Sequence, residues 1–234
     1  KTKTNKSRKI TQYNLFKKNE LSFSQIRELK EFSDKNGIMF HATPTNVRAV
    51  NELIDIGCEV IKNGSDFLTN FKILSAIAKS KIPIVISTGM CKKKEIDFAL
   101  SFFSKYKKNN IIILHCVSNY PTQTQDANIS RILNLKNTYK ILTGYSDHTI
   151  GYNTAILARV MGSVWFEKHF TLNKKFQGPD HFFSCDQKDY KDYISNIRNV
   201  DISLGNGNIS FVPNFLIFVS LFTISFLKCH GKTK

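Results

Sequence analysis

The chain has 234 residues, a formal net charge of +16 and a hydrophobic share of 41%, which is ordinary for a globular protein. Its length is sufficient for one large domain with a substantial core. The five cysteines are odd in number and form no C-x-x-C pair, which argues against a disulfide framework or a zinc knuckle and favours a reducing, cytoplasmic location.

From residue 22 onward, segments with helical spacing alternate with short apolar runs that are typical of strands. The expected helices cover residues 23–35, 46–56, 70–80, 92–108, 128–139, 152–161 and 187–199, and the expected strands cover residues 37–42, 59–62, 82–87, 111–115, 141–144 and 164–167. The strands are continuously apolar, which indicates parallel strands buried on both faces. The pattern therefore predicts an α/β fold with six strand–helix units.

Two architectures fit this alternation, an open doubly wound sheet and a (β/α)8 barrel of the TIM type. Functional-looking residues follow nearly every strand, namely Thr43, Lys62, Ser65, Ser87, Thr88, His115, Ser118, Tyr120, Ser146, His148, His169 and Asp180. An open sheet concentrates its site at one switch point, whereas a barrel collects residues from many strand ends. The distribution favours an incomplete barrel, with about six of its eight units present.

The positive charge has three interpretations: a nucleic-acid partner, attraction of anionic small molecules, or a genome that favours Lys and Asn codons. The basic residues are mostly lysines spread along the chain, and Arg-rich segments of the kind that read bases or clamp phosphates are absent. We prefer the codon interpretation and expect no nucleic-acid partner. The dense basic run at residues 1–9 is expected to form a mobile arm that extends to about residue 20.

The other end of the chain is unusually apolar. Residues 211–227 read FVPNFLIFVSLFTISFL, and their length is near the short limit for a membrane span. A tail anchor, a buried helix and out-of-place sequence all remain open for this segment, although a membrane location is not favoured.

Two histidines stand near the ends of two apolar runs, His148 in Ser-Asp-His-Thr and His169 in Glu-Lys-His-Phe-Thr. Imidazoles at successive strand ends are a common way to present a divalent metal. A structural role is the alternative for each, but two such histidines beside acidic residues favour metal ligands. Strand alternation is expected to direct Glu167 away from His169 or to keep it structural. His41 and His181 are weaker candidates.

Hydroxyl groups and one lysine predict an anion site near the same strand ends. Ser87, Thr88 and Gly89 stand between a strand and a helix, where free N–H groups suit a phosphate; a plain helix cap is the alternative. Lys62 and Ser65 add a cation and a hydroxyl after another strand, unless the lysine only reaches out to water.

Cys116 follows His115 directly, but adjacent strand residues point to opposite faces, so a nucleophilic pair is not favoured. Ser118 and Tyr120 are better interpreted as hydrogen-bond donors to a substrate.

Six short motifs occur in one order along the chain: KNGS at 62–65, STGM at 87–90, HCVSNYPT at 115–122, GYSDHT at 144–149, EKHFT at 167–171 and GPDH at 178–181. In these motifs the chain resembles the sialic acid synthase family, the N-acetylneuraminate synthases and their legionaminic acid relatives, from about residue 21 to about residue 207. The resemblance implies a barrel enzyme that condenses phosphoenolpyruvate with an N-acetylmannosamine-type sugar. The products are a nonulosonic acid, used in surface-carbohydrate biosynthesis, and phosphate.

The resemblance also implies the roles of individual residues. His148 and His169 would hold a divalent metal, Mn²⁺ or Mg²⁺, that takes part in catalysis. Thr43 and Lys62 would bind the carboxylate region of phosphoenolpyruvate, and its phosphate would be held by Ser65, Ser87, Ser118 and Ser146. Tyr120 and Asp180 would contact the sugar.

The chain also departs from the family pattern. The Glu-bearing first strand and the Lys-x-Gln-type motif of the second strand are not found, and Asp66 and Phe67 stand where the family has Gly and an acidic residue. The antifreeze-like domain through which family members pair as homodimers is replaced by the apolar tail. We therefore expect an arm at 1–20, a partial synthase barrel at 21–207 and an anomalous tail at 208–234. A non-catalytic, poorly soluble fragment of the same family is the alternative to an active enzyme.

Overall fold

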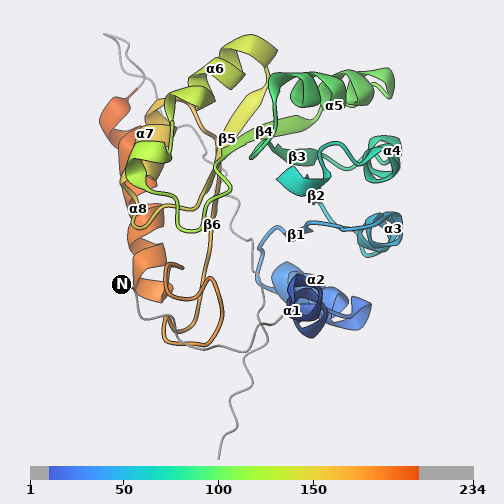
Figure 1. Cartoon of the computed structure of the whole chain (residues 1–234), viewed down its shortest axis with the longest axis horizontal. Coiled ribbons are helices and arrows are strands. Elements are labelled where there is room, and N and C mark those ends of the chain that lie inside the picture. Colours follow the sequence, from blue (N-terminus) through green and yellow to red (C-terminus); the bar gives the residue numbers. More distant parts are fainter. Residues whose placement is uncertain (1–10, 206–234) are drawn as a thin grey trace, which may run out of the picture.

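Six parallel strands form the centre of the fold, in a computed structural model that describes residues 11–205. The strands are β1 (His41–Ala42), β2 (Val60–Asn63), β3 (Ile84–Ser87), β4 (Ile111–Cys116), β5 (Leu142–Asp147) and β6 (Trp165–Lys168). They pair in chain order, each parallel to the next. Figure 1 shows that the sheet curls into an arc with the helices on its outer side. The predicted α/β architecture with six parallel strands is confirmed.

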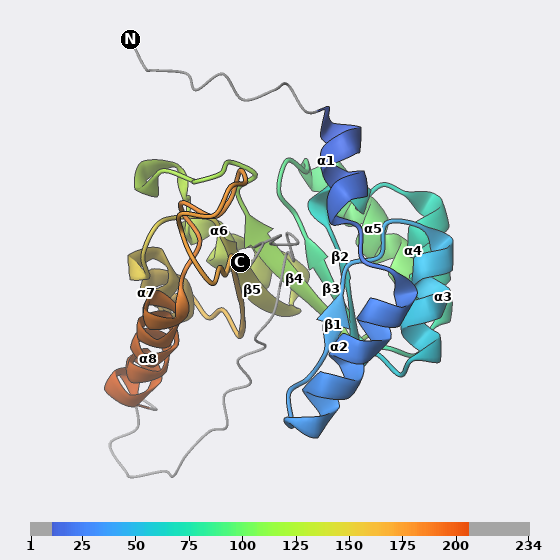
Figure 2. The same ribbon diagram turned by 90° about the horizontal axis from the view of Figure 1, so that it is seen from below.

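The helices are α1 (Gln12–Asn19), α2 (Phe23–Lys35), α3 (Val47–Asp55), α4 (Phe71–Lys79), α5 (Lys93–Lys105), α6 (Ser130–Tyr139), α7 (Asn153–Val160) and α8 (Gln187–Leu204), with short 3₁₀ turns η1 (Ser65–Phe67) and η2 (Thr124–Asp126). Helices α3 to α7 connect successive strands, α1 and α2 precede β1, and α8 follows β6. Figure 2 shows α2 to α5 along one flank of the sheet and α6 to α8 along the other. The helix-connected parallel order is the arrangement expected of β/α units.

The strands are buried on both faces, and successive side chains alternate between them. Residues on one face pack against helices in two clusters, which include Ile61, Ile84, Ile86, Ile111 and Ile113 in the first and Tyr145 and Phe166 in the second. Residues on the inner face form a third cluster of Val60, Val85, Leu114 and Trp165, with Ile112 packed against it. The strands are continuously apolar in sequence because their side chains pack against the helices on one face and against one another on the inner face.

Several elements differ from the expected ranges: β1 is limited to His41–Ala42, and α8 continues to Leu204. β5 continues to Asp147 rather than ending at residue 144, because its ladder pairs Cys116 with Ser146 on one side and Asp147 with Lys168 on the other. The segment 1–20, expected to be a mobile arm, contains α1, whose first turn is capped by the Thr11 hydroxyl accepting from the Asn14 N–H.

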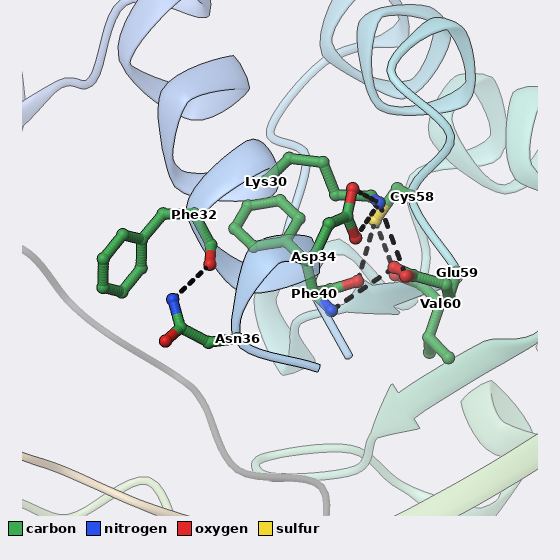
Figure 3. A network of polar contacts seen from close by, with 8 residues as sticks. All are labelled: Lys30, Phe32, Asp34, Asn36, Phe40, Cys58, Glu59 and Val60. Atoms are coloured by element: carbon green, nitrogen blue, oxygen red, sulfur yellow. Dashed lines mark hydrogen bonds and ion pairs between the residues drawn. The ribbon is translucent and has the colours of Figure 1, made fainter. Parts of the chain in front are cut away.

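A polar network fastens α2 to the loop before β2 (Figure 3). Lys30 donates to both carboxylate oxygens of Asp34 at 2.6 Å and lies 3.4 Å from Glu59. Glu59 in turn accepts from the Phe40 N–H at 3.3 Å, and the Cys58 thiol donates to the Phe40 carbonyl. The network holds the chain segment that leads into β1 against β2.

Among residues 11–205, no helix is long and apolar enough to cross a membrane. The apolar tail predicted at 208–234, including residues 211–227, lies outside the described residues.

The close approach of β5 to its neighbours depends on one glycine. A Cβ atom at Gly144 would lie 2.5 Å from Leu114 Cδ2 and 2.6 Å from the Trp165 carbonyl oxygen. We expect Gly144→Ala to lower the free energy of unfolding by about 1–3 kcal/mol, because the backbone of β6 must shift. Urea unfolding measures this change.

Gly64→Ala is the matched control, because its Cβ would make only ordinary contacts with Thr43 and Phe67 at a backbone φ of −64°. Equal stability changes in the two variants would contradict the tight packing assigned to β5.

Candidate functional site

Polar side chains gather on the inner face where the strands end. Four of these residues lie two positions after an inner-face residue of the same strand: Lys62, Ser87, Cys116 and Glu167. The fifth, Ser146, stands opposite Cys116 in the ladder between β4 and β5. Because the strands are parallel, their carboxyl ends meet at one edge of the curled sheet. The structure therefore brings together residues that are spread over more than 100 positions of the sequence.

Three loops converge on Gly89 and form a small cradle of donors. The Ser65 hydroxyl accepts from the Gly89 N–H at 2.9 Å. A Cβ at position 89 would lie 2.5 Å from Ser118 Oγ and 3.1 Å from Cys116 Sγ, so a side chain there would displace the Ser118 hydroxyl. Hydroxyl groups around a backbone that can approach a ligand closely suit a phosphate group.

The remaining hydroxyl candidates lie beside this cradle. The Ser87 hydroxyl is buried and has no hydrogen-bond partner among the described residues, which leaves it available to a ligand. Ser146 is buried and stands opposite Cys116 in the ladder between β4 and β5. Thr43 reaches the loop after β2, with its methyl group 3.5 Å from the position of a Cβ at Gly64.

His148 and His169 lie next to each other, as the metal hypothesis requires. Their ring centroids are 5.3 Å apart, and the rings are nearly perpendicular at 82°. The Nδ1 atom of His148 lies 2.7 Å from the Val117 carbonyl, so this nitrogen carries the proton and Nε2 keeps its lone pair. The ring of Tyr120 lies against both imidazoles, with centroids 4.2 Å from His148 and 5.7 Å from His169.

Burial keeps both imidazoles neutral at ordinary pH. Desolvation, together with the charge of the neighbouring imidazole, lowers the pKa of His169 to about 3. Desolvation also lowers the pKa of His148. Neutral imidazoles are the protonation state that metal ligands need, so the pair fits a divalent ion. The described residues contain no cluster of three or more His, Cys, Asp or Glu side chains that could hold a metal.

Two groups predicted to contact a sugar flank the histidines. Asp180 Oδ2 lies 3.7 Å from His169 Nδ1, and partial burial raises the pKa of this carboxyl. Desolvation raises the pKa of the Tyr120 phenol to about 12, so the phenol stays protonated and able to donate.

Glu167 forms a buried ion pair, which agrees with the structural role expected as one of its two alternatives. It lies two residues before His169, so strand alternation puts it on the inner face, where its Oε2 atom is 2.9 Å from Lys62 Nζ. Lys62 is therefore part of a buried ion pair and does not reach out to water.

The outer face carries a second buried ion pair. Lys168 donates to Asp147 Oδ2 at 2.8 Å and to the Thr149 carbonyl at 2.5 Å. The other oxygen of Asp147 accepts from the N–H and the hydroxyl of Thr149. These bonds fix the turn on both sides of His148.

The structure separates His115 from Cys116, as strand alternation predicts. His115 Nε2 lies 2.7 Å from the Ala127 carbonyl, on the side of the helices. Cys116 instead lies 3.9 Å from His148 Nδ1, and burial raises the pKa of its thiol. His181 is also outside the site and pairs with the Thr171 hydroxyl at 2.8 Å.

Comparison with known proteins decides the family. Residues 1–209 match the NeuB family. The chain belongs to the NeuB family. This result confirms the resemblance to sialic acid synthases that the six motifs indicate.

Relatives with known names are synthases. The N,N'-diacetyllegionaminic acid synthase of Legionella pneumophila is 36% identical over 88% of this chain and 59% of its own length. An uncharacterized protein of Methanocaldococcus jannaschii, MJ1065, is 40% identical over 86% of this chain and 60% of its own length. This NeuB-family chain thus spans about three fifths of the length of the curated relatives it matches.

A solved structure with the same fold is an N-acetylneuraminic acid (sialic acid) synthetase from Leptospira borgpetersenii, in complex with citrate. It superposes with a TM-score of 0.80 and 37% sequence identity, over 85% of this chain and 70% of that one. The curled sheet of this chain is therefore the fold of a NeuB-family synthase.

The ion pair of Lys168 gives a stability prediction for this NeuB-family chain. Lys168→Met leaves Asp147 buried without its partner, so we expect the free energy of unfolding to fall by about 3–5 kcal/mol. Lys93→Met, in the exposed pair with Asp97, is the matched control and should change little. Urea unfolding that shows the same stability for both variants would contradict the role given to Lys168.

Buried neutral histidines give a pH prediction. Desolvation lowers the pKa of both His41 and His115 in the folded chain. In the unfolded chain they titrate near about 6.5. Below this pH the unfolded state binds protons that the folded state does not, so stability should fall as the pH is lowered from about 7.5 to about 5.5. We expect His115→Gln to reduce this fall, by up to about 1.4 kcal/mol per pH unit. Denaturant titrations at both pH values with equal falls in the two proteins would refute the assignment.

Proposed function

We propose that this site binds phosphoenolpyruvate and a divalent metal, and that the chain belongs to an enzyme that condenses phosphoenolpyruvate with an N-acetylmannosamine-type sugar. Membership in a family whose named relatives are legionaminic, pseudaminic and sialic acid synthases supports this proposal. The observation that carries it is the convergence of a buried lysine, a hydroxyl cradle and two adjacent neutral imidazoles at one edge of the sheet.

The anion end of the substrate would meet this chain's own cations and hydroxyls. Lys62 supplies one positive charge, and the hydroxyls of Ser65, Ser87, Ser118 and Ser146 are neutral donors near the Gly89 backbone. A dianionic phosphate placed there gains charge-assisted hydrogen bonds. Thr43, beside the loop after β2, is proposed to bind the carboxylate region.

His148 and His169 are proposed to hold Mn²⁺ or Mg²⁺, which when bound would polarise the aldehyde oxygen of the sugar. The Val117 carbonyl orients His148 for this role by fixing its proton on Nδ1. Asp180 lies 3.7 Å from His169 and the ring of Tyr120 lies 5.7 Å from it, and both residues are proposed to bind sugar hydroxyls.

In the proposed reaction, C3 of phosphoenolpyruvate forms a bond to the aldehyde carbon, which becomes an alcohol. Water adds at C2, and the bond between C2 and the phosphate oxygen breaks, so that phosphate leaves. The chain's part is to hold both substrates in line and to exclude bulk water, which is where much of such catalysis originates. The phenol of Tyr120, whose pKa is about 12, can donate a hydrogen bond throughout.

Because the chain spans 59% and 60% of two relatives, a complete eight-stranded barrel and a homodimer are proposals for the whole protein. A cytoplasmic location is proposed as well, because phosphoenolpyruvate is an intracellular metabolite and Cys58, Cys91, Cys116 and Cys185 are free thiols.

Calorimetric titration of the chain with phosphoenolpyruvate, with and without Mn²⁺, tests the substrate site. We expect saturable binding of one phosphoenolpyruvate per chain, and loss of Mn²⁺ binding by at least about tenfold in His148→Ala and His169→Ala, because each removes one of two imidazole ligands. His181→Ala, which alters a histidine outside the site, is the matched control. Absence of binding in the wild-type chain would contradict the proposal.

Phosphate release from phosphoenolpyruvate plus N-acetylmannosamine then separates an enzyme from a non-catalytic relative that keeps the site. Release that requires the sugar and the metal supports the enzyme. Binding without any release supports the non-catalytic alternative.

A further inference from the structure

The lysine of the anion site is held by a carboxylate from the far side of the sheet. Lys62 is on β2 and Glu167 is on β6, yet Nζ and Oε2 are 2.9 Å apart. Their side chains are only 11% and 5% exposed. The pair therefore spans the hollow of the arc, and it joins the second strand to the sixth without passing through the strands between them.

The pair is incompletely satisfied in this structure. The second carboxylate oxygen of Glu167, Oε1, is buried and has no hydrogen-bond partner among residues 11–205. His41, which feels the charges of both Glu167 and Lys62, has neither ring nitrogen bonded within the same described part of the chain. The centroid of its ring lies 5.2 Å from the centroid of the Trp165 ring, and Trp165 is two residues before Glu167 on β6. A buried carboxylate with one oxygen unpaired is costly, so its retention calls for a reason other than packing.

We propose that Glu167 is a positioning residue, whose carboxylate holds the Lys62 ammonium at the inner edge of the sheet so that it can bind the anionic substrate. This inference rests on the proposed anion site and adds to it a residue outside the set predicted from the sequence. Lys62 has four rotatable side-chain bonds and no other carboxylate partner among the described residues. Without Glu167, a buried ammonium would be left uncompensated and would move from this position.

The pair also explains how one lysine can serve a multiply charged anion. Lys62 has three N–H donors, and Glu167 engages one of them through Oε2. Two donors remain for a ligand that enters from the side of the serine hydroxyls. Glu167 therefore acts through Lys62 and need not touch the substrate.

The test is a double-mutant cycle on phosphoenolpyruvate binding with Glu167→Gln, Lys62→Met and the double variant. Gln has the same shape and no charge. We expect Glu167→Gln to weaken binding about tenfold, an ordinary coupling for neighbouring charged groups. In the Lys62→Met background the same change should have no further effect, because the group that Glu167 positions is gone. Glu167→Asp, which keeps the charge, should recover part of the affinity.

Asp97→Asn is the matched control, because it removes an equal charge from the exposed pair with Lys93. It should leave binding unchanged. Unchanged or tighter binding in Glu167→Gln, or an equal loss with and without Lys62, would overturn the proposal. Tighter binding in particular would mean that Glu167 competes with the substrate for Lys62.

A second measurement does not depend on the substrate. Acetylation of Lys62 by acetic anhydride, followed by mass spectrometry, should be slow in the wild-type chain and faster in Glu167→Gln but not in Asp97→Asn. If phosphoenolpyruvate fails to bind to every variant while Lys62 labelling responds to Glu167→Gln, the proposed function fails and the positioning contact stands. If labelling is the same in all variants, the positioning role is refuted.

Discussion

The six strands are buried on both faces, so each side chain along them faces either the helices or the inner side of the curled sheet. Ile61 and Tyr145 serve the helices, while Lys62 and Ser146, one position further on, face inward. A shift of one residue in any strand would exchange these roles. The candidate functional site depends on this register, because its side chains follow the apolar inner-face residues by two positions along each strand.

Each buried charge on the strands forms an ion pair with a residue of another strand. Lys62 pairs with Glu167 across the hollow, and Lys168 pairs with Asp147 on the opposite face of neighbouring strands. β6 thus contributes a carboxylate to the inner face and an ammonium to the outer face at adjacent positions. The Lys168–Asp147 pair lies directly before both candidate metal ligands, since His148 follows Asp147 and His169 follows Lys168 in the chain. These four charged residues therefore stabilise the fold and also lie in or beside the candidate site.

Much of this arrangement is predictable from the sequence. Apolar runs of parallel-strand character locate all six strands, and six short motifs indicate the family and contain nine of the ten proposed site residues, with Thr43 outside them. What the sequence misses lies in distances between strands that are far apart in the chain. Nothing local to Lys62 names Glu167 as its partner, which lies 105 positions later. Cys116 likewise meets His148 instead of the adjacent His115, because neighbouring residues of a strand face opposite ways. The length of β5 was also underestimated, since its last residues are held by ladders with β4 and β6 and not by their own propensity.

The central claim is that the two imidazoles and the hydroxyl cradle form one site. Anomalous diffraction from crystals of the chain soaked with Mn²⁺ and phosphoenolpyruvate tests it most directly. The account predicts a manganese peak within about 2.2 Å of a nitrogen of both His148 and His169, a typical metal–imidazole distance, with the phosphate beside Ser65 and Gly89. A peak bound elsewhere, or a phosphate remote from this cradle, would contradict it.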